Sequence, residues 1–177
     1  MTGEEFARNA ENLIGRRYSD VDCIGVVRLS ANIRCSGTNW LWRSYHNSKK
    51  YQYLTERADI APARSQVQDG LLVFRVRWGN VPEGYSDTPN CYHVGVIQGD
   101  TVIQSNPGPG VYKSPYKPED WDACGMLKSI NYSRPFLMDD IGIVDDDIYT
   151  PSADTLSDRE LLERIYYMLL LRGDSID

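Results

Sequence analysis

The stretch "CYHVGVIQGDTVIQS", from Cys91 to Ser105, constrains the fold of this chain more than any other segment. Two apolar, β-branched runs flank the pair Gly99-Asp100, and such a pair between strand-like runs is typical of a tight hairpin turn. The sequence therefore predicts two antiparallel strands joined at this pair. In that arrangement His93 on the first strand and Gln104 on the second are expected to lie near one another.

Helix signals come earlier in the chain than most strand signals. Apolar residues recur at helical spacing from Phe6 to Ile14, and a second apolar run begins at about Cys23 and ends near Gly37. Further strand signals lie in "DGLLVFRVRW" and in "GMLKSINY". Helices followed by strands predict an α+β fold, with N-terminal helices packed on a mainly antiparallel sheet.

The segment between Gly37 and Ile60 is rich in aromatic and cationic side chains, and we expect it to be irregular or partly helical. Trp40 and Trp42 have two interpretations here. They pack in a satellite core, or they line a groove that receives a substrate.

The composition changes after Pro135, which suggests a folded domain over residues 1–135 and an acidic arm with a helix over residues 136–177. Ser157 and Glu160 form a capping box, an apolar stripe follows, and Gly173 ends the pattern. This C-terminal amphipathic helix is expected either to dock on the domain or to contact a protein partner.

Charge and cysteine spacing exclude several classes of function. A net charge of -6 without a basic run argues against nucleic acid and anionic membranes as partners. No apolar stretch is long enough to cross a bilayer, and the first residues lack a secretory signal, so a cytoplasmic location until delivery or lysis is expected. Four cysteines without a C-x-x-C pair and only two histidines argue against a metal site and favour reduced thiols.

Cys23 follows Asp22, a helix-capping residue type, at the point where the second helix is expected to begin. A helix N-terminus stabilises a thiolate and lowers the pKa of a thiol, although the carboxylate of Asp22 opposes this effect. Together with a base at His93 and an orienting amide at Gln104, Cys23 would complete a triad for thiol catalysis. The alternative is that all three are structural: a small core cysteine, a strand histidine and a solvated glutamine.

Three segments, in the same order, resemble the NlpC-type family of bacterial cell-wall cysteine peptidases, which have a compact papain-like fold. "LIGRRYSDVDCIGVVR" is similar to the family's G-x-x-Y…D-C-S-G block, and "DGLLVFRV" to its G-D-L-hydrophobic-hydrophobic-F strand. "HVGVIQGDTVIQS" is similar to the block H-V-G-I-Y-hydrophobic-G-x-G-x-hydrophobic-I-H. The resemblance extends from about residue 4 to about residue 132. The chain departs from the pattern at Ile24, in place of the usual serine, and lacks the family's Gly-Gly loop.

The resemblance implies a nucleophile at Cys23, a base at His93, an orienting residue at Gln104 and oxyanion support from Tyr18. It implies hydrolysis of an amide bond in peptidoglycan stem peptides, between D-glutamate and a diamino acid, without a metal or organic cofactor. Delivery within a phage or prophage assembly, or release on lysis, would bring the enzyme to the wall. Two alternatives stay open: a non-catalytic papain-like binding module, and a related amidase or effector toxin.

Overall fold

The computed structural model describes residues 1–44, 52–78, 89–134 and 136. Residues 1–76 and 91–139 belong to one compact unit, which holds every predicted site residue. The described helices are α1 (Gly3–Glu11), α2 (Cys23–Ala31) and α3 (Thr38–Arg43), with short 3-10 helices η2 (Arg64–Gln66) and η3 (Pro118–Asp120). The described strands are β1 (Leu54–Ala58), β2 (Leu72–Arg77), β3 (Asn90–Gln98), β4 (Thr101–Asn106), β5 (Gly110–Pro115) and β6 (Ala123–Leu127).

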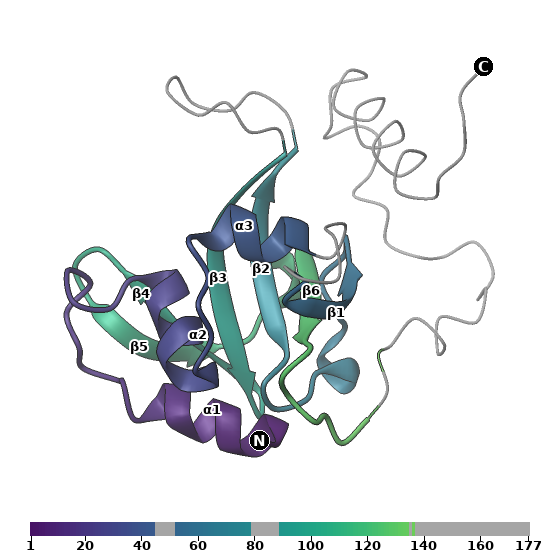
Figure 1. Ribbon diagram of the computed structural model, residues 1–177, viewed down its shortest axis with the longest axis horizontal. Coiled ribbons are helices and arrows are strands. Elements are labelled where there is room, and N and C mark those ends of the chain that lie inside the picture. Colours follow the sequence, from purple (N-terminus) through teal and green to yellow (C-terminus); the bar gives the residue numbers. More distant parts are fainter. Residues whose placement is uncertain (45–51, 79–88, 135, 137–177) are drawn as a thin grey trace. The chain divides into compact units, whose positions relative to one another are not determined.

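The strands form one sheet in the order β1-β6-β2-β3-β4-β5. The pairs β1–β6, β2–β6, β3–β4 and β4–β5 are antiparallel. Helices α1 and α2 contact each other and β4, whereas α3 contacts β1, at the other end of the sheet (Figure 1). The prediction of an α+β fold with helices on an antiparallel sheet is therefore confirmed.

The predicted hairpin is present as β3 and β4. Gln98 pairs with Thr101 across the turn and Val96 pairs with Ile103 further along, so the turn lies at the expected residues. Gly99 has a φ of 57°, a left-handed conformation that glycine adopts without steric cost. Because this register is set at the turn, it also determines which side chains of the two strands face each other.

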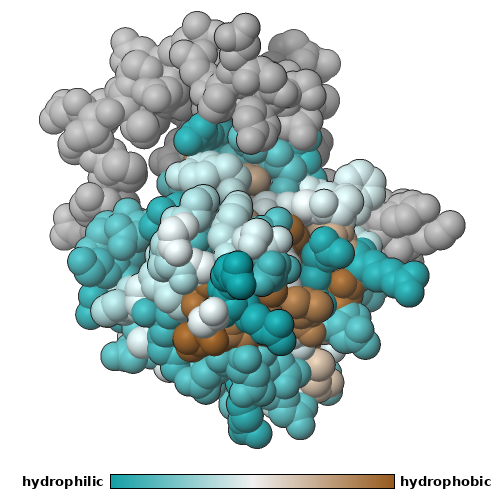
Figure 2. All heavy atoms as spheres, turned by 90° about the vertical axis from the view of Figure 1, so that its left-hand side faces the viewer, coloured by the Kyte–Doolittle hydropathy of each residue, from teal (hydrophilic) through white to brown (hydrophobic). Residues whose placement is uncertain are grey.

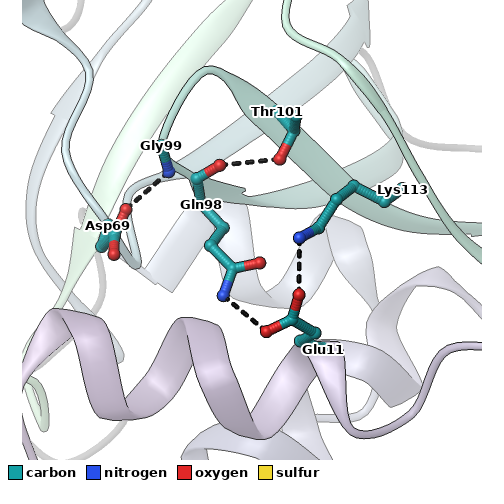
Figure 3. A network of polar contacts seen from close by, with 6 residues as sticks. All are labelled: Glu11, Asp69, Gln98, Gly99, Thr101 and Lys113. Atoms are coloured by element: carbon teal, nitrogen blue, oxygen red, sulfur yellow. Dashed lines mark hydrogen bonds and ion pairs between the residues drawn. The ribbon is translucent and has the colours of Figure 1, made fainter.

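A polar network fixes this turn against α1 and β5 (Figure 3). The Asp69 carboxylate accepts a hydrogen bond from the Gly99 amide at 2.6 Å, and the Thr101 hydroxyl donates to the Gln98 carbonyl at 2.7 Å. The Gln98 side chain donates to Glu11 at 3.0 Å, and Lys113 pairs with the same carboxylate at 2.6 Å. The hydrogen bond from Lys113, followed by that from Gln98, lowers the pKa of Glu11. The network thus links one helix and three strands around the turn.

The structure contains two strands that the sequence analysis did not predict, β1 and β5. Both are edge strands, since they lie at the two ends of the sheet order. Their sequences, "LTERA" and "GVYKSP", lack a regular apolar alternation. Polar residues are common on edge strands because one side of the strand is unpaired. Pairing with β6 and β4 therefore decides their conformation, and local sequence does not.

Helix α2 starts where it was expected, and both N-terminal helices end sooner than expected. Thr2 and Glu5 form a capping box at the start of α1, and the Asp22 carboxylate accepts from the Gly25 amide at 2.7 Å at the start of α2. Helix α2 ends at Ala31, because Asn32 takes a left-handed conformation with a φ of 52°. The predicted end near Gly37 is therefore wrong by about two turns.

Packing against the core of this unit continues at Phe136, directly after the predicted boundary at 135. Phe136 is buried in a core cluster that contains Val73, Ile97 and Trp121. The preceding backbone is held by Gln68, whose side-chain oxygen accepts from the Arg134 amide and whose side-chain nitrogen donates to the Arg134 carbonyl, both at 3.1 Å. The rest of the predicted acidic arm and the helix over 157–173 lie outside the described residues.

The side of the molecule that carries β4 and β5 shows hydrophobic side chains between hydrophilic ones (Figure 2). Across the described residues, the exposed large hydrophobic side chains include Ile14 and Leu29. None of the helices described here has the length and hydrophobicity that a membrane span requires.

A buried hydroxyl attaches the start of α2 to the sheet. The Ser105 side chain on β4 donates a hydrogen bond to the Val21 carbonyl at 2.6 Å, and both residues are buried. Val21 lies two residues before Cys23, and Ser105 follows Gln104 directly. This bond therefore links the beginning of α2 to the part of β4 that carries the predicted orienting residue.

We predict that Ser105→Ala lowers the free energy of unfolding by about 1–3 kcal/mol, because it leaves the buried Val21 carbonyl without its donor. Urea denaturation followed by circular dichroism measures this change. Ser19→Ala is the matched control, since Ser19 is exposed and bonds only its neighbour Asp20. Equal stability of the two variants would contradict the prediction.

Candidate functional site

The structure brings His93 and Gln104 into direct contact. The Nε2 atom of His93 on β3 lies 2.8 Å from the Oε1 atom of Gln104 on β4, and both residues are buried. An amide oxygen only accepts hydrogen bonds, so this contact assigns the proton of the neutral ring to Nε2. The other ring nitrogen, Nδ1, then carries a lone pair and is able to accept a proton.

Further hydrogen bonds fix the orientation of the Gln104 amide. Its nitrogen donates to the Ser114 hydroxyl at 2.8 Å, while its oxygen also accepts from the Asn106 amide at 3.5 Å. The Asn106 nitrogen in turn donates to the Tyr112 hydroxyl at 2.8 Å. Because the nitrogen is already used, the oxygen of Gln104 points toward the imidazole. Strands β4 and β5 thus hold the orienting residue in one rotamer.

An aromatic stack holds the other side of the imidazole. The rings of His93 and Trp121 lie 5.7 Å apart between centroids with an interplanar angle of 17°, and the Arg75 guanidinium lies 5.0 Å from the centre of the Trp121 ring. A Cβ atom at Gly95 would lie only 3.0 Å from Trp121, so the missing side chain at Gly95 leaves room for the indole. Burial lowers the pKa of His93, the Gln104 hydrogen bond raises it, and the charge of Arg75 lowers it further.

Cys23 is the first residue of α2, as predicted, but its sulfur is enclosed. The residue is 7% exposed, and its Sγ atom lies 3.7 Å from the Thr38 hydroxyl at the start of α3. Burial raises the pKa of the Cys23 thiol above its ordinary value, and the Asp22 carboxylate raises it further. Hydrogen bonds from Thr38 and from the backbone amides of Val94 and Ile24 lower it, without reversing the shift. The Ile24 amide in the first turn of α2 therefore lowers the pKa of Cys23, as predicted for a helix N-terminus, but desolvation outweighs this effect and the net shift is upward.

Cys23 lies against the short segment of β3 that carries His93. The Val94 amide that stabilises the Cys23 thiolate belongs to the residue directly after His93. Between these two described side chains no direct hydrogen bond is present: the sulfur bonds Thr38 and the ring bonds Gln104. The base and its orienting residue are thus assembled, and the thiol lies against the strand that carries the base.

The remaining predicted site residues differ in their surroundings. Tyr18 lies in the loop between α1 and α2 and is partly exposed. Trp40 on α3 is 43% exposed. Trp42 is 2% exposed, with the Arg57 guanidinium 4.1 Å from its ring centre, which favours the core interpretation of this residue.

Backbone pairing places the Tyr18 loop against β5. The Gly15 amide donates to the Val111 carbonyl at 2.9 Å, and the Val111 amide donates to the Arg16 carbonyl at 2.8 Å. Gly110 permits this approach, because its φ is 71° and a Cβ atom there would lie 2.1 Å from the Arg16 carbonyl oxygen. The segment between α1 and α2 is therefore attached to the edge of the sheet by backbone hydrogen bonds.

Sequence analysis did not identify Thr38, Trp121 or Ser114 as neighbours of the site. Thr38 and Trp121 are distant in sequence from the residues they contact, and neither belongs to a motif that marks a site. The position of Ser114 near Gln104 could in principle have been predicted, because Ser114 lies in the strand that pairs with the strand carrying Gln104. The sequence of β5 does not predict a strand, so the contact between Ser114 and Gln104 was not expected.

Comparison with known proteins gives no assignment for this chain. No protein-family model matches it, and no curated protein matches it significantly. The functional interpretation therefore depends on the motifs and on the geometry described above.

We predict that Asp22→Ser lowers the pKa of the Cys23 thiol, because it removes a nearby negative charge while a serine hydroxyl still caps α2. A lower pKa means a larger thiolate fraction, so alkylation of Cys23 by iodoacetamide at pH 7.5 should become about two- to fivefold faster. Peptide mass spectrometry measures this rate at Cys23 separately from the other cysteines.

Asp20→Ser is the control, since Asp20 is exposed and lies outside the cap. Unchanged or slower labelling in Asp22→Ser, with the helix content preserved, would show that Asp22 does not act on the sulfur.

Proposed function

We propose that this protein is a cysteine hydrolase that cleaves an amide bond in peptidoglycan stem peptides, using Cys23, His93 and Gln104 on a papain-like fold. The observation that carries the proposal is the 2.8 Å hydrogen bond from His93 to Gln104, which leaves Nδ1 available as a base. A hydrogen bond from the Val94 amide, next to His93 on β3, lowers the pKa of the Cys23 thiol, which supports its role as nucleophile. The choice of stem peptide as substrate comes from the motif resemblance.

Acylation begins when Nδ1 of His93 accepts the Cys23 proton and the sulfur attacks the substrate carbonyl carbon. The resulting oxyanion accepts a hydrogen bond from the amide of Cys23, which as the first residue of α2 has no acceptor within its helix. Tyr18 is the second proposed donor. The imidazolium then gives its Nδ1 proton to the leaving amine, the carbon–nitrogen bond breaks, and a thioester on Cys23 remains.

In deacylation, water is the nucleophile and His93 is again the base. Nδ1 of His93 accepts a proton from water, and the hydroxide attacks the thioester carbon. When the second tetrahedral intermediate collapses, the carbon–sulfur bond breaks and the proton on His93 returns to the sulfur. The products are a carboxylate and the free thiol, so no external oxidant, reductant or cofactor takes part. Throughout, Gln104 keeps the imidazole in the tautomer that the reaction requires.

Burial has a direct consequence for this mechanism. It raises the pKa of Cys23 and lowers the pKa of His93, so both favour a neutral thiol beside a neutral imidazole in the resting state. Proton transfer is therefore expected to occur together with attack on the bound substrate. The same enclosed, neutral thiol also favours a second candidate function, a non-catalytic papain-like binding module.

We predict that Cys23→Ala abolishes hydrolysis of purified muropeptides and that His93→Ala lowers the rate by about 10²–10⁴-fold. Gln104→Ala should lower it less, by about 10–10²-fold, since the ring loses its orientation and keeps its basicity. Mass spectrometry of the products gives the rate, and the new amino terminus identifies the bond and separates a stem peptidase from an amidase.

Two controls accompany these variants. Gln66→Ala removes a glutamine of η2, whose side chain accepts a hydrogen bond from the Ala63 amide and lies outside both the candidate site and the hairpin. Cys124→Ala removes another buried thiol, on β6. Full activity in Cys23→Ala would contradict the proposal, and a wild-type protein that binds muropeptides without cleaving them would favour the binding module.

A further inference from the structure

The Cys23 sulfur and the Thr38 hydroxyl form a buried pair between two helices. Their separation is 3.7 Å, and Thr38 is 8% exposed. Thr38 is the first residue of α3, and the residue before it, Gly37, supplies no side-chain cap. The Thr38 hydroxyl is therefore directed at a thiol of another helix instead of closing its own helix.

The loop before α3 and the residue after Thr38 hold this hydroxyl in place. The Cys35 thiol donates to the Gly37 carbonyl at 3.3 Å, which restrains the approach to the helix. The Asn39 side chain accepts from the Cys91 amide at 2.6 Å. Thr38 and Asn39 thus connect the proposed nucleophile to the strand that carries His93, two residues before the imidazole.

Hydrogen-bond chemistry makes this contact depend on the charge of the sulfur. When the thiol is protonated, either atom of the pair is able to donate. When the sulfur is a thiolate it only accepts, and the hydroxyl then donates a charge-assisted hydrogen bond, which is stronger than a neutral one. The contact therefore stabilises the thiolate more than the thiol.

We propose that Thr38 is a fourth residue of the site, whose hydroxyl holds the Cys23 sulfur and donates a hydrogen bond to its thiolate. This inference deepens the proposed function and rests on it. The lowering effect of Thr38 on the pKa of Cys23 agrees with the geometry. Among the side chains that contact the sulfur, Thr38 thus offsets part of the cost of enclosing a nucleophile in the protein interior.

Other titratable groups act on the same sulfur. The Asp22 carboxylate, from the start of α2, raises its pKa. The charge of the Cys23 thiolate in turn raises the pKa of the buried Cys91 thiol on β3, where burial is the larger cause. His93, on the same strand, is the proposed proton acceptor. These groups are identical in all Thr38 variants, so a difference between the variants reports on the hydroxyl.

The test measures alkylation of Cys23 by iodoacetamide in the full chain at several pH values between about 6 and 10, with site-specific mass spectrometry. Thr38→Val removes the hydroxyl at nearly constant volume and should slow labelling at neutral pH by about tenfold, with the profile displaced to higher pH. Thr38→Ser keeps the hydroxyl and should label within about twofold of the wild type. Thr55→Val is the matched control, since the Thr55 hydroxyl contacts the Met126 carbonyl on the β1–β6 pair.

Labelling of Thr38→Val at the wild-type rate throughout the pH range would overturn the inference. So would a Thr38→Ser variant as slow as Thr38→Val, because the methyl group would then be responsible. If Thr38→Val does not fold, the pair Thr38→Ala and Thr38→Ser differs only in the oxygen and gives the same comparison.

Muropeptide hydrolysis by the wild type, measured in parallel, separates the two proposals. Hydrolysis with identical labelling of all Thr38 variants would leave the hydrolase standing and remove Thr38 from it. Absence of hydrolysis with the predicted change in labelling would remove the hydrolase and keep the hydrogen bond to the thiolate.

Discussion

The register of the β3–β4 hairpin is the constraint on which the rest of the site depends. Pairing of Gln98 with Thr101 at the turn brings the His93 ring within 2.8 Å of the Gln104 oxygen several residues away. A slip of one residue would turn each side chain to the opposite face of the sheet and separate the two groups. The polar network at the turn therefore supports the candidate site, although its residues lie at the far end of β3 from the imidazole.

Burial favours the neutral form of both proposed reactive groups. It raises the pKa of the Cys23 thiol and lowers the pKa of the His93 imidazole. Donors from three elements oppose it at the sulfur: the amide of Ile24 on α2, the hydroxyl of Thr38 on α3 and the amide of Val94 on β3. An enclosed nucleophile of this kind depends on such fixed hydrogen bonds, because water contributes little to stabilising its charge.

Local chemistry was sufficient to predict the central features of the fold. The Gly99-Asp100 turn and the Asp22 cap each depend on a few adjacent residues, and both are present. The edge strands β1 and β5 were missed because their conformation comes from pairing with distant strands. The net upward shift in the pKa of Cys23 was missed for a related reason: a sequence shows a helix N-terminus but does not show how much protein covers it.

The most direct test of the account is whether Cys23 and His93 act as a pair. It compares the pH dependence of Cys23 alkylation in the wild type with that in His93→Ala, with correct folding of both checked by circular dichroism. The account predicts that the wild type labels about tenfold faster at neutral pH, because the imidazole accepts the thiol proton. Superimposable pH profiles would show that the sulfur and the ring are independent, and this result would contradict the proposed hydrolase.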